Sequence, residues 1–171
     1  SAGESAGALS VMYLMASPGA RGLFAKAIAQ SAYMISTPEL KQARFGEEAA
    51  EAIGSRLAAA LGAADLAALR AIDATKLIAT AGQSGYIPFG TIDGRVLPRQ
   101  LVEVFDRGEQ APVPILAGFN SGEIRSLRFL IPPVPADAPT YEAAIRSRYA
   151  DRADEFLKLY PSTRLEESIL A

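Results

Sequence analysis

The sequence predicts an α/β fold, with helices and at least one short strand along the chain. Two features carry this prediction. A short apolar run at Val113–Ala117 is typical of a buried strand, and long stretches rich in Ala and Leu place apolar residues at helical spacing. The chain of 171 residues is 50% hydrophobic and 21% charged, which is enough apolar material for one domain with a packed core.

The N-terminal third predicts one helix and one strand. Residues 8–16 lack helix breakers and carry large apolar side chains among small ones, so we expect a helix buried on most sides that ends at Ser17-Pro18-Gly19. In the following segment the best strand candidate is KAIAQSA at 26–32, with a surface helix as the alternative. No strand is evident in front of Gly3.

The middle of the chain predicts helices. Residues 37–62 form the clearest one, with Thr37 as N-cap, Pro38 in the first turn and Gly62 as the stop. Its expected apolar face comprises Leu40, Phe45, Ile53 and Leu57. Two shorter helices are expected at 63–73 and 74–82.

The remaining elements are shorter. Residues 86–98 predict extended chain with an Asp93-Gly94 turn, and 98–108 predict an amphipathic helix. A buried strand at 113–117 then leads into a Gly-rich loop. A Pro-rich connector at 131–139 precedes helical patterns at 140–161 and 162–171.

Composition excludes several classes of function. The net charge is −2 and no Lys/Arg run is present, so we expect no nucleic-acid partner. No apolar run reaches the ~18 residues of a membrane span. The absence of Cys excludes thiol catalysis and disulfides, and the absence of His means that this chain alone cannot supply an imidazole base.

One motif can carry chemistry. Gly3-Glu4-Ser5-Ala6-Gly7 fits G-x-S-x-G, in which a serine on a tight strand-to-helix turn exposes its hydroxyl. The outer glycines allow a strained backbone and a close approach of neighbouring elements, and the N–H of Ala6 can point at a developing oxyanion. A Gly-Ser turn without a catalytic role is the alternative, because such short strings also occur by chance.

Several further segments agree with the motif. GESAGALSV, SPGARGLFAKAIAQSA and PFGTIDGRVLPRQLVEVFDRGEQAPVPILAGFNSGE together resemble the type B carboxylesterases, the serine hydrolases that include cholinesterases and bacterial para-nitrobenzyl esterases. They stand in the family's order and spacing and cover about residues 3–32 and 86–123. The resemblance implies a partial α/β-hydrolase fold, a mostly parallel sheet flanked by helices with an inserted helical region. It also implies a Ser-Glu-His acyl-enzyme mechanism on a small-molecule carboxylic ester, with no metal or organic cofactor.

The resemblance also implies roles for individual residues. Ser5 becomes the nucleophile, Ala6 an oxyanion-hole donor and Glu123 the triad acid, which would orient an imidazole. The loop departs from the family pattern G-x-N-x-D-E-G at Gly122 and Ile124, which puts its conformation in question. A solvated loop carboxylate is the alternative for Glu123.

The resemblance assigns less specific roles to five further residues. Glu4 is expected to be a buried, hydrogen-bonded structural residue. Ser31 matches a serine near the triad acid, with an ordinary buried strand serine as the alternative. Tyr33, Met34 and Tyr86 fall where the family lines its acyl pocket, and a generic core is the alternative.

The family's order of parts explains the missing histidine. The glycine-rich oxyanion loop precedes the serine and the His follows the acid. We therefore expect residues 1–171, which start without Met and stop inside a helical pattern, to be a fragment of a single catalytic domain. It would run from the nucleophile elbow to beyond the acid loop, and it would be inactive alone. A cut sheet should also expose strand edges and favour aggregation. The alternative function is that of a non-catalytic α/β-hydrolase-like binding protein.

Overall fold

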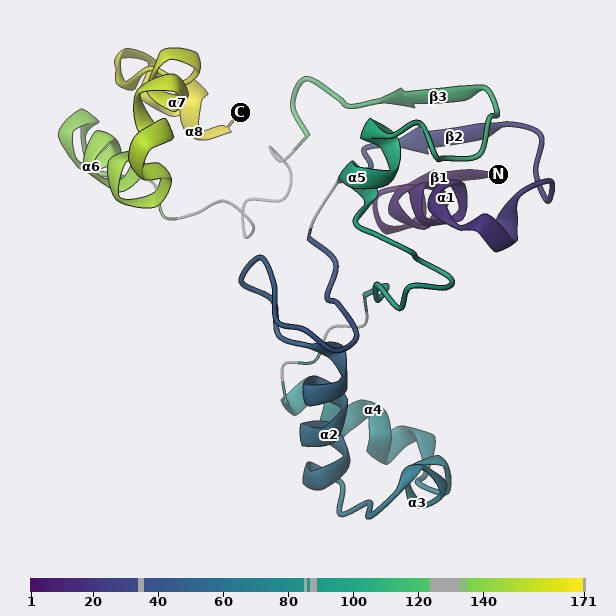
Figure 1. Ribbon diagram of the computed structural model, residues 1–171. Coiled ribbons are helices and arrows are strands. Elements are labelled where there is room, and N and C mark those ends of the chain that lie inside the picture. Colours follow the sequence, from purple (N-terminus) through teal and green to yellow (C-terminus); the bar gives the residue numbers. More distant parts are fainter. Residues whose placement is uncertain (34–35, 85, 87–88, 124–132, 134, 171) are drawn as a thin grey trace. The chain divides into compact units, whose positions relative to one another are not determined.

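A computed structural model describes residues 1–33, 36–84, 86, 89–123, 133 and 135–170 of the chain (Figure 1). The chain divides into two compact units, Ser1–Gly118 and Phe119–Ala171. The first unit contains the sheet and five α-helices among its described residues, and the second contains helices.

The sheet of the first unit has three parallel strands in the order β1-β2-β3. They are β1 (Ala2–Glu4), β2 (Ala27–Gln30) and β3 (Ile115–Gly118). The register pairs Gly3 with Ala29 and Ala29 with Ala117. The strand predicted at 26–32 is confirmed and the surface-helix alternative is wrong. No strand was expected in front of Gly3, but a short strand leads into Ser5: β1 begins at Ala2, includes Gly3 and Glu4 of the motif, and pairs with β2.

Helix α1 (Ala6–Ala16) covers one face of this sheet. Ala27 and Ala29 of β2 are buried, and Ala27 packs with Val11 and Met15 of α1. Helix α5 (Leu101–Asp106) packs against α1 through Leu101 and Val104, which join a second core cluster with Leu9. The small side chains of β2 therefore allow the helix to lie close to the strands.

The opposite face of the sheet is exposed in the described part of the first unit. Ile28 and Leu116 share that face through the register, and they are 38% and 67% exposed. All four residues of β3, which is one of the two edge strands, are exposed. A strand was predicted at 113–117 and is present, but its predicted burial is wrong for the described residues.

The long helix predicted at 37–62 is wrong in its first half, since α2 spans only Ala50–Ala60. The preceding residues pair with a distant segment: Leu40 donates its N–H to the carbonyl of Ile92, and Ile92 donates to Pro38. Phe45 and Gly46 then form a two-residue turn with positive φ values of 55° and 79°. These long-range hydrogen bonds replace the helical ones that local propensity favours.

The two shorter helices are present as predicted, as α3 (Leu66–Arg70) and α4 (Ala74–Gln83). Asp65 caps α3 by accepting from the N–H of Ala68, and Asp73 caps α4 by accepting from Thr75 and Lys76. Extended chain follows, and Asp93 holds the predicted turn by accepting from three backbone N–H groups.

The second unit contains α6 (Ala138–Tyr149), α7 (Ala153–Leu159) and α8 (Leu165–Leu170). The continuous helix predicted at 140–161 is interrupted at Ala150, where φ is 46°. Phe156 stacks on Tyr149 with ring centroids 4.4 Å apart, and the hydroxyl of Tyr141 donates to the carbonyl of Tyr160. Among the described residues no helix combines the length and the apolar character needed to cross a membrane.

Candidate active site

Ser5 lies at the turn between β1 and α1, with φ 52° and ψ −118°. Such a positive φ is uncommon for a residue with a side chain and stores local strain. Ser5 occupies the N-cap position of α1, where a serine hydroxyl ordinarily accepts from the first turn, yet its side chain makes no capping hydrogen bond. Its backbone conformation therefore leaves the exposed hydroxyl unused by the helix.

The glycine of β1 is required by the close approach of α1. A Cβ on Gly3 would overlap the carbonyl group of Gly7 and lie 2.7 Å from the amide nitrogen of Ala8. A Cβ on Gly7, in contrast, would meet nothing within 4 Å in the described structure. Of the two motif glycines, only Gly3 is demanded by packing.

The start of α1 supplies backbone donors beside Ser5. In an α-helix the first N–H groups have no carbonyl partner within the helix, and they carry the positive end of the helix dipole. Ala6 is the first residue of α1 and is exposed. Its position fits the predicted oxyanion donor, since an N–H here adjoins the serine.

Ser31 is brought next to this turn by the sheet. The N–H of Ser5 donates to the carbonyl of Gln30 at 3.0 Å, and the N–H of Ser31 donates to the carbonyl of Gly118 at 2.8 Å. Ser31 has φ 54°, close to the value at Ser5. Both serines thus follow the carboxyl ends of neighbouring parallel strands. Ser31 lies just past β2 and is half-buried, so the alternative of a buried strand serine is wrong.

Glu4 is the last residue of β1 and is exposed. The expectation of a buried glutamate is therefore wrong for the described structure. Glu4 and Gln30 pair in register on the face of the sheet opposite to α1, and Gln30 is exposed as well.

Glu123 belongs to the second unit, whereas Ser5 belongs to the first, so each is described in its own surroundings. Glu123 is half-buried in a turn, and the side-chain amide of Asn120 donates to its Oε2 at 3.1 Å. Sequence reasoning missed this contact. The spacing of three residues within one loop is the signal that could have found it, because such a spacing brings side chains together in a turn.

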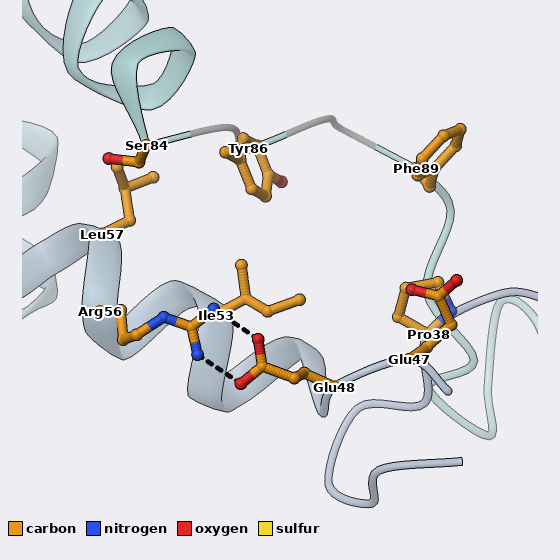
Figure 2. Close-up of a pocket in the computed structure, with 9 residues that line it drawn as sticks. All are labelled: Pro38, Glu47, Glu48, Ile53, Arg56, Leu57, Ser84, Tyr86 and Phe89. Atoms are coloured by element: carbon orange, nitrogen blue, oxygen red, sulfur yellow. Dashed lines mark hydrogen bonds and ion pairs between the residues drawn. The ribbon is translucent and has the colours of Figure 1, made fainter. Parts of the chain in front are cut away.

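Of the three predicted acyl-pocket residues, Tyr33 and Tyr86 lie among the described residues. Met34 lies outside the described residues, and Tyr33 is 37% exposed after β2. Tyr86 lines a pocket of about 270 Å³ together with residues of α2 (Figure 2). Sequence reasoning missed this pocket, because residues distant along the chain form it.

Figure 2 shows Tyr86 and Phe89 on one side of this pocket and Ile53 on the other. Arg56 donates to both carboxylate oxygens of Glu48, at 2.5 and 2.6 Å. These hydrogen bonds lower the pKa of Glu48 and raise that of Arg56. No group of three or more Asp or Glu side chains in the described ranges is placed to hold a metal ion.

Comparison with known proteins agrees with this geometry. The carboxylesterase family matches residues 2–166, and the chain therefore belongs to the carboxylesterase family. No curated protein gave a match.

Solved structures give the same result. A PNB esterase is 27% identical, with a TM-score of 0.71 over 98% of this chain and 35% of its own. A thermophilic PNB esterase is 26% identical, with a TM-score of 0.66 over 98% and 35% of the two chains. The carboxylesterase EST55 of Geobacillus stearothermophilus is 26% identical, with a TM-score of 0.59 over 99% and 39%.

These neighbours are esterases of the α/β-hydrolase fold, so the predicted partial α/β-hydrolase fold is confirmed. The chain spans between 35% and 39% of the length of the three esterases compared here.

Proposed function

We propose that this chain is part of the catalytic domain of a carboxylic ester hydrolase in which Ser5 is the nucleophile. One observation carries the proposal: Ser5 is held at a positive φ between a strand and a helix, and its side chain does not cap that helix. The strained turn keeps the hydroxyl exposed beside the helix N-terminus, which is where acyl transfer needs both a nucleophile and backbone donors.

The proposed reaction has two steps. The Oγ of Ser5 attacks the ester carbonyl carbon while its proton passes to a histidine, and the N–H of Ala6 stabilises the oxyanion. The alcohol leaves with that proton, and water then releases the acid and restores Ser5. Because the chain contains no His, the base must come from outside these residues. The residues alone should therefore be inactive.

The remaining roles follow from the resemblance to type B carboxylesterases. Glu123 would orient the histidine, and its contact with Asn120 supports a fixed side-chain position. Ser31 would act through hydrogen bonding near that acid, and its place one strand from Ser5 supports this role. Tyr33, Met34 and Tyr86 are proposed to contact the acyl group.

Labelling of the complete catalytic domain with a fluorophosphonate tests the nucleophile. We expect label on Ser5, and hydrolysis of para-nitrophenyl acetate that falls by about 10⁵–10⁶-fold in Ser5→Ala. Ser55→Ala is the matched control, because Ser55 is exposed on α2 and its hydroxyl donates to the carbonyl of Glu51 within the same helix. Full activity in Ser5→Ala would disprove the assignment, and a complete domain that neither labels nor hydrolyses esters would be a binding module.

A further inference from the structure

The pocket at α2 has walls that suit the apolar part of a small ligand. Ile53 and Leu57 project from α2, and Tyr86 and Phe89 face them across the pocket (Figure 2). The two aromatic side chains are 40% and 41% exposed, so their rings remain accessible to a ligand. The volume of about 270 Å³ lies just below the ~300–1,000 Å³ of typical ligand pockets, which limits the occupant to a small molecule.

The charges around the pocket do not cancel. Glu48 and Arg56 neutralise each other through their two hydrogen bonds. Glu47 also lines the pocket, and in the described part of the chain its carboxylate takes part in no ion pair. Among the described residues that line the pocket, one negative charge is therefore in excess.

The position of that charge favours one class of ligand. In Figure 2 the carboxylate of Glu47 lies beside Pro38, on the side of the pocket where Phe89 stands. A carboxylate attracts an ammonium group, and an aromatic ring face adds a cation–π attraction. An anionic ligand would need the guanidinium of Arg56, which Glu48 already engages with both oxygens.

We propose that this pocket is a binding site for small amphiphilic cations, in which an ammonium group faces Glu47 and an apolar body lies between Ile53 and the two aromatic rings. Tyr86 of this pocket is also proposed to contact the acyl group of the ester, whereas Glu47 has no part in the proposed hydrolysis.

Equilibrium binding to the complete catalytic domain tests the proposal with three probes of similar shape: phenethylammonium, the neutral 2-phenylethanol and the anionic 3-phenylpropionate. We expect phenethylammonium to bind most tightly. Glu47→Gln should weaken its binding about fivefold and leave that of 2-phenylethanol unchanged. Raising the salt concentration should weaken the cation selectively.

Two control variants make the test specific. Glu51→Gln removes an exposed carboxylate of α2 that does not line the pocket, and it should leave binding unchanged. Ile53→Trp should fill the pocket and abolish the binding of phenethylammonium and of 2-phenylethanol. Binding of phenethylammonium should persist in Ser5→Ala, so a failure of the proposed ester hydrolysis can be distinguished from a failure of cation binding.

Equal affinity for the cation and the neutral probe would overturn the proposal, and so would an equal loss in Glu47→Gln and Glu51→Gln. Circular dichroism reports whether each variant is folded. If Glu47→Gln does not fold, the proposal is tested on the unmodified domain by the probe series and its salt dependence. A preference for the cation that salt does not weaken would overturn the proposal.

Discussion

A side chain on Gly3 would overlap the carbonyl group of Gly7, so β1 and α1 approach each other more closely than any residue with a Cβ allows. This contact holds the backbone on both sides of Ser5. The strain at Ser5 is thus maintained by the packing of the two elements that flank it, in agreement with the general finding that strained residues persist where surrounding structure fixes them.

Gly3→Ala and Gly7→Ala should therefore behave differently. The alanine at position 3 meets backbone atoms that cannot move independently, so we expect a loss of about 2–3 kcal/mol in the free energy of unfolding. The alanine at position 7 meets open space in a helix and should stabilise by up to ~1 kcal/mol. Urea unfolding measures the free-energy change in each variant. Equal changes in the two variants would contradict the conclusion that the packing of α1 requires glycine at position 3 only.

Glu123→Gln should lower kcat for ester hydrolysis by about 10⁴-fold in the complete catalytic domain, because the amide cannot stabilise an imidazolium in the same way. The matched control is Glu155→Gln, an exposed glutamate of α7 in the same unit. A kcat within twofold of the parent enzyme would contradict the assignment of Glu123 as the acid.

Gln100→Ala should destabilise the first unit by about 2–3 kcal/mol. The side chain of Gln100 accepts from the N–H of Thr37 at 3.0 Å and donates to its carbonyl at 2.8 Å, and both residues are buried. Truncation leaves the two backbone groups of Thr37 without these partners. Thermal unfolding checks this expectation, with the exposed Gln42→Ala as a control that should change stability little.

Asp93→Asn should reduce the acid sensitivity of the fold. The N–H of Arg95, followed by those of Leu97 and Val96, lowers the pKa of Asp93 below its usual value. A lowered folded-state pKa gives stability that is present above the unfolded pKa of about 3.9 and is lost as pH falls through the folded value. Urea unfolding as a function of pH should show that the variant loses less of its free energy of unfolding below about pH 4. An unchanged pH dependence of the free energy of unfolding would contradict this role of Asp93.

The exposed face of the sheet should drive self-association when residues 1–171 are made alone. Leu116 is 67% exposed on that face, beside Ile28. Leu116→Thr should lower the light scattering of the isolated chain while keeping strand propensity. Leu66→Thr removes a leucine that is 59% exposed on α3, and it should have little effect. An isolated chain that stays monomeric would contradict the expectation.

Much of the fold was predictable from particular residues. The G-x-S-x-G pattern located the turn at Ser5, and the apolar runs located β2 and β3. The site was less predictable. Asn120 has a contact with Glu123 that no motif singled out, and the pocket of Ile53 and Tyr86 joins segments that are distant in the sequence.

The amino-acid sequence by itself determined the features that depend on neighbouring residues: the elbow at Ser5, the Asp-capped helices α3 and α4, and the turn at Asp93. Only the tertiary structure decided that residues 37–49 do not continue α2 as one helix. The physical reason is that Gln100 and Ile92 satisfy the backbone groups of Thr37, Pro38 and Leu40 from far along the chain. The helix propensities of residues 37–49 do not depend on these distant partners, and the hydrogen bonds to the partners outweigh the propensities.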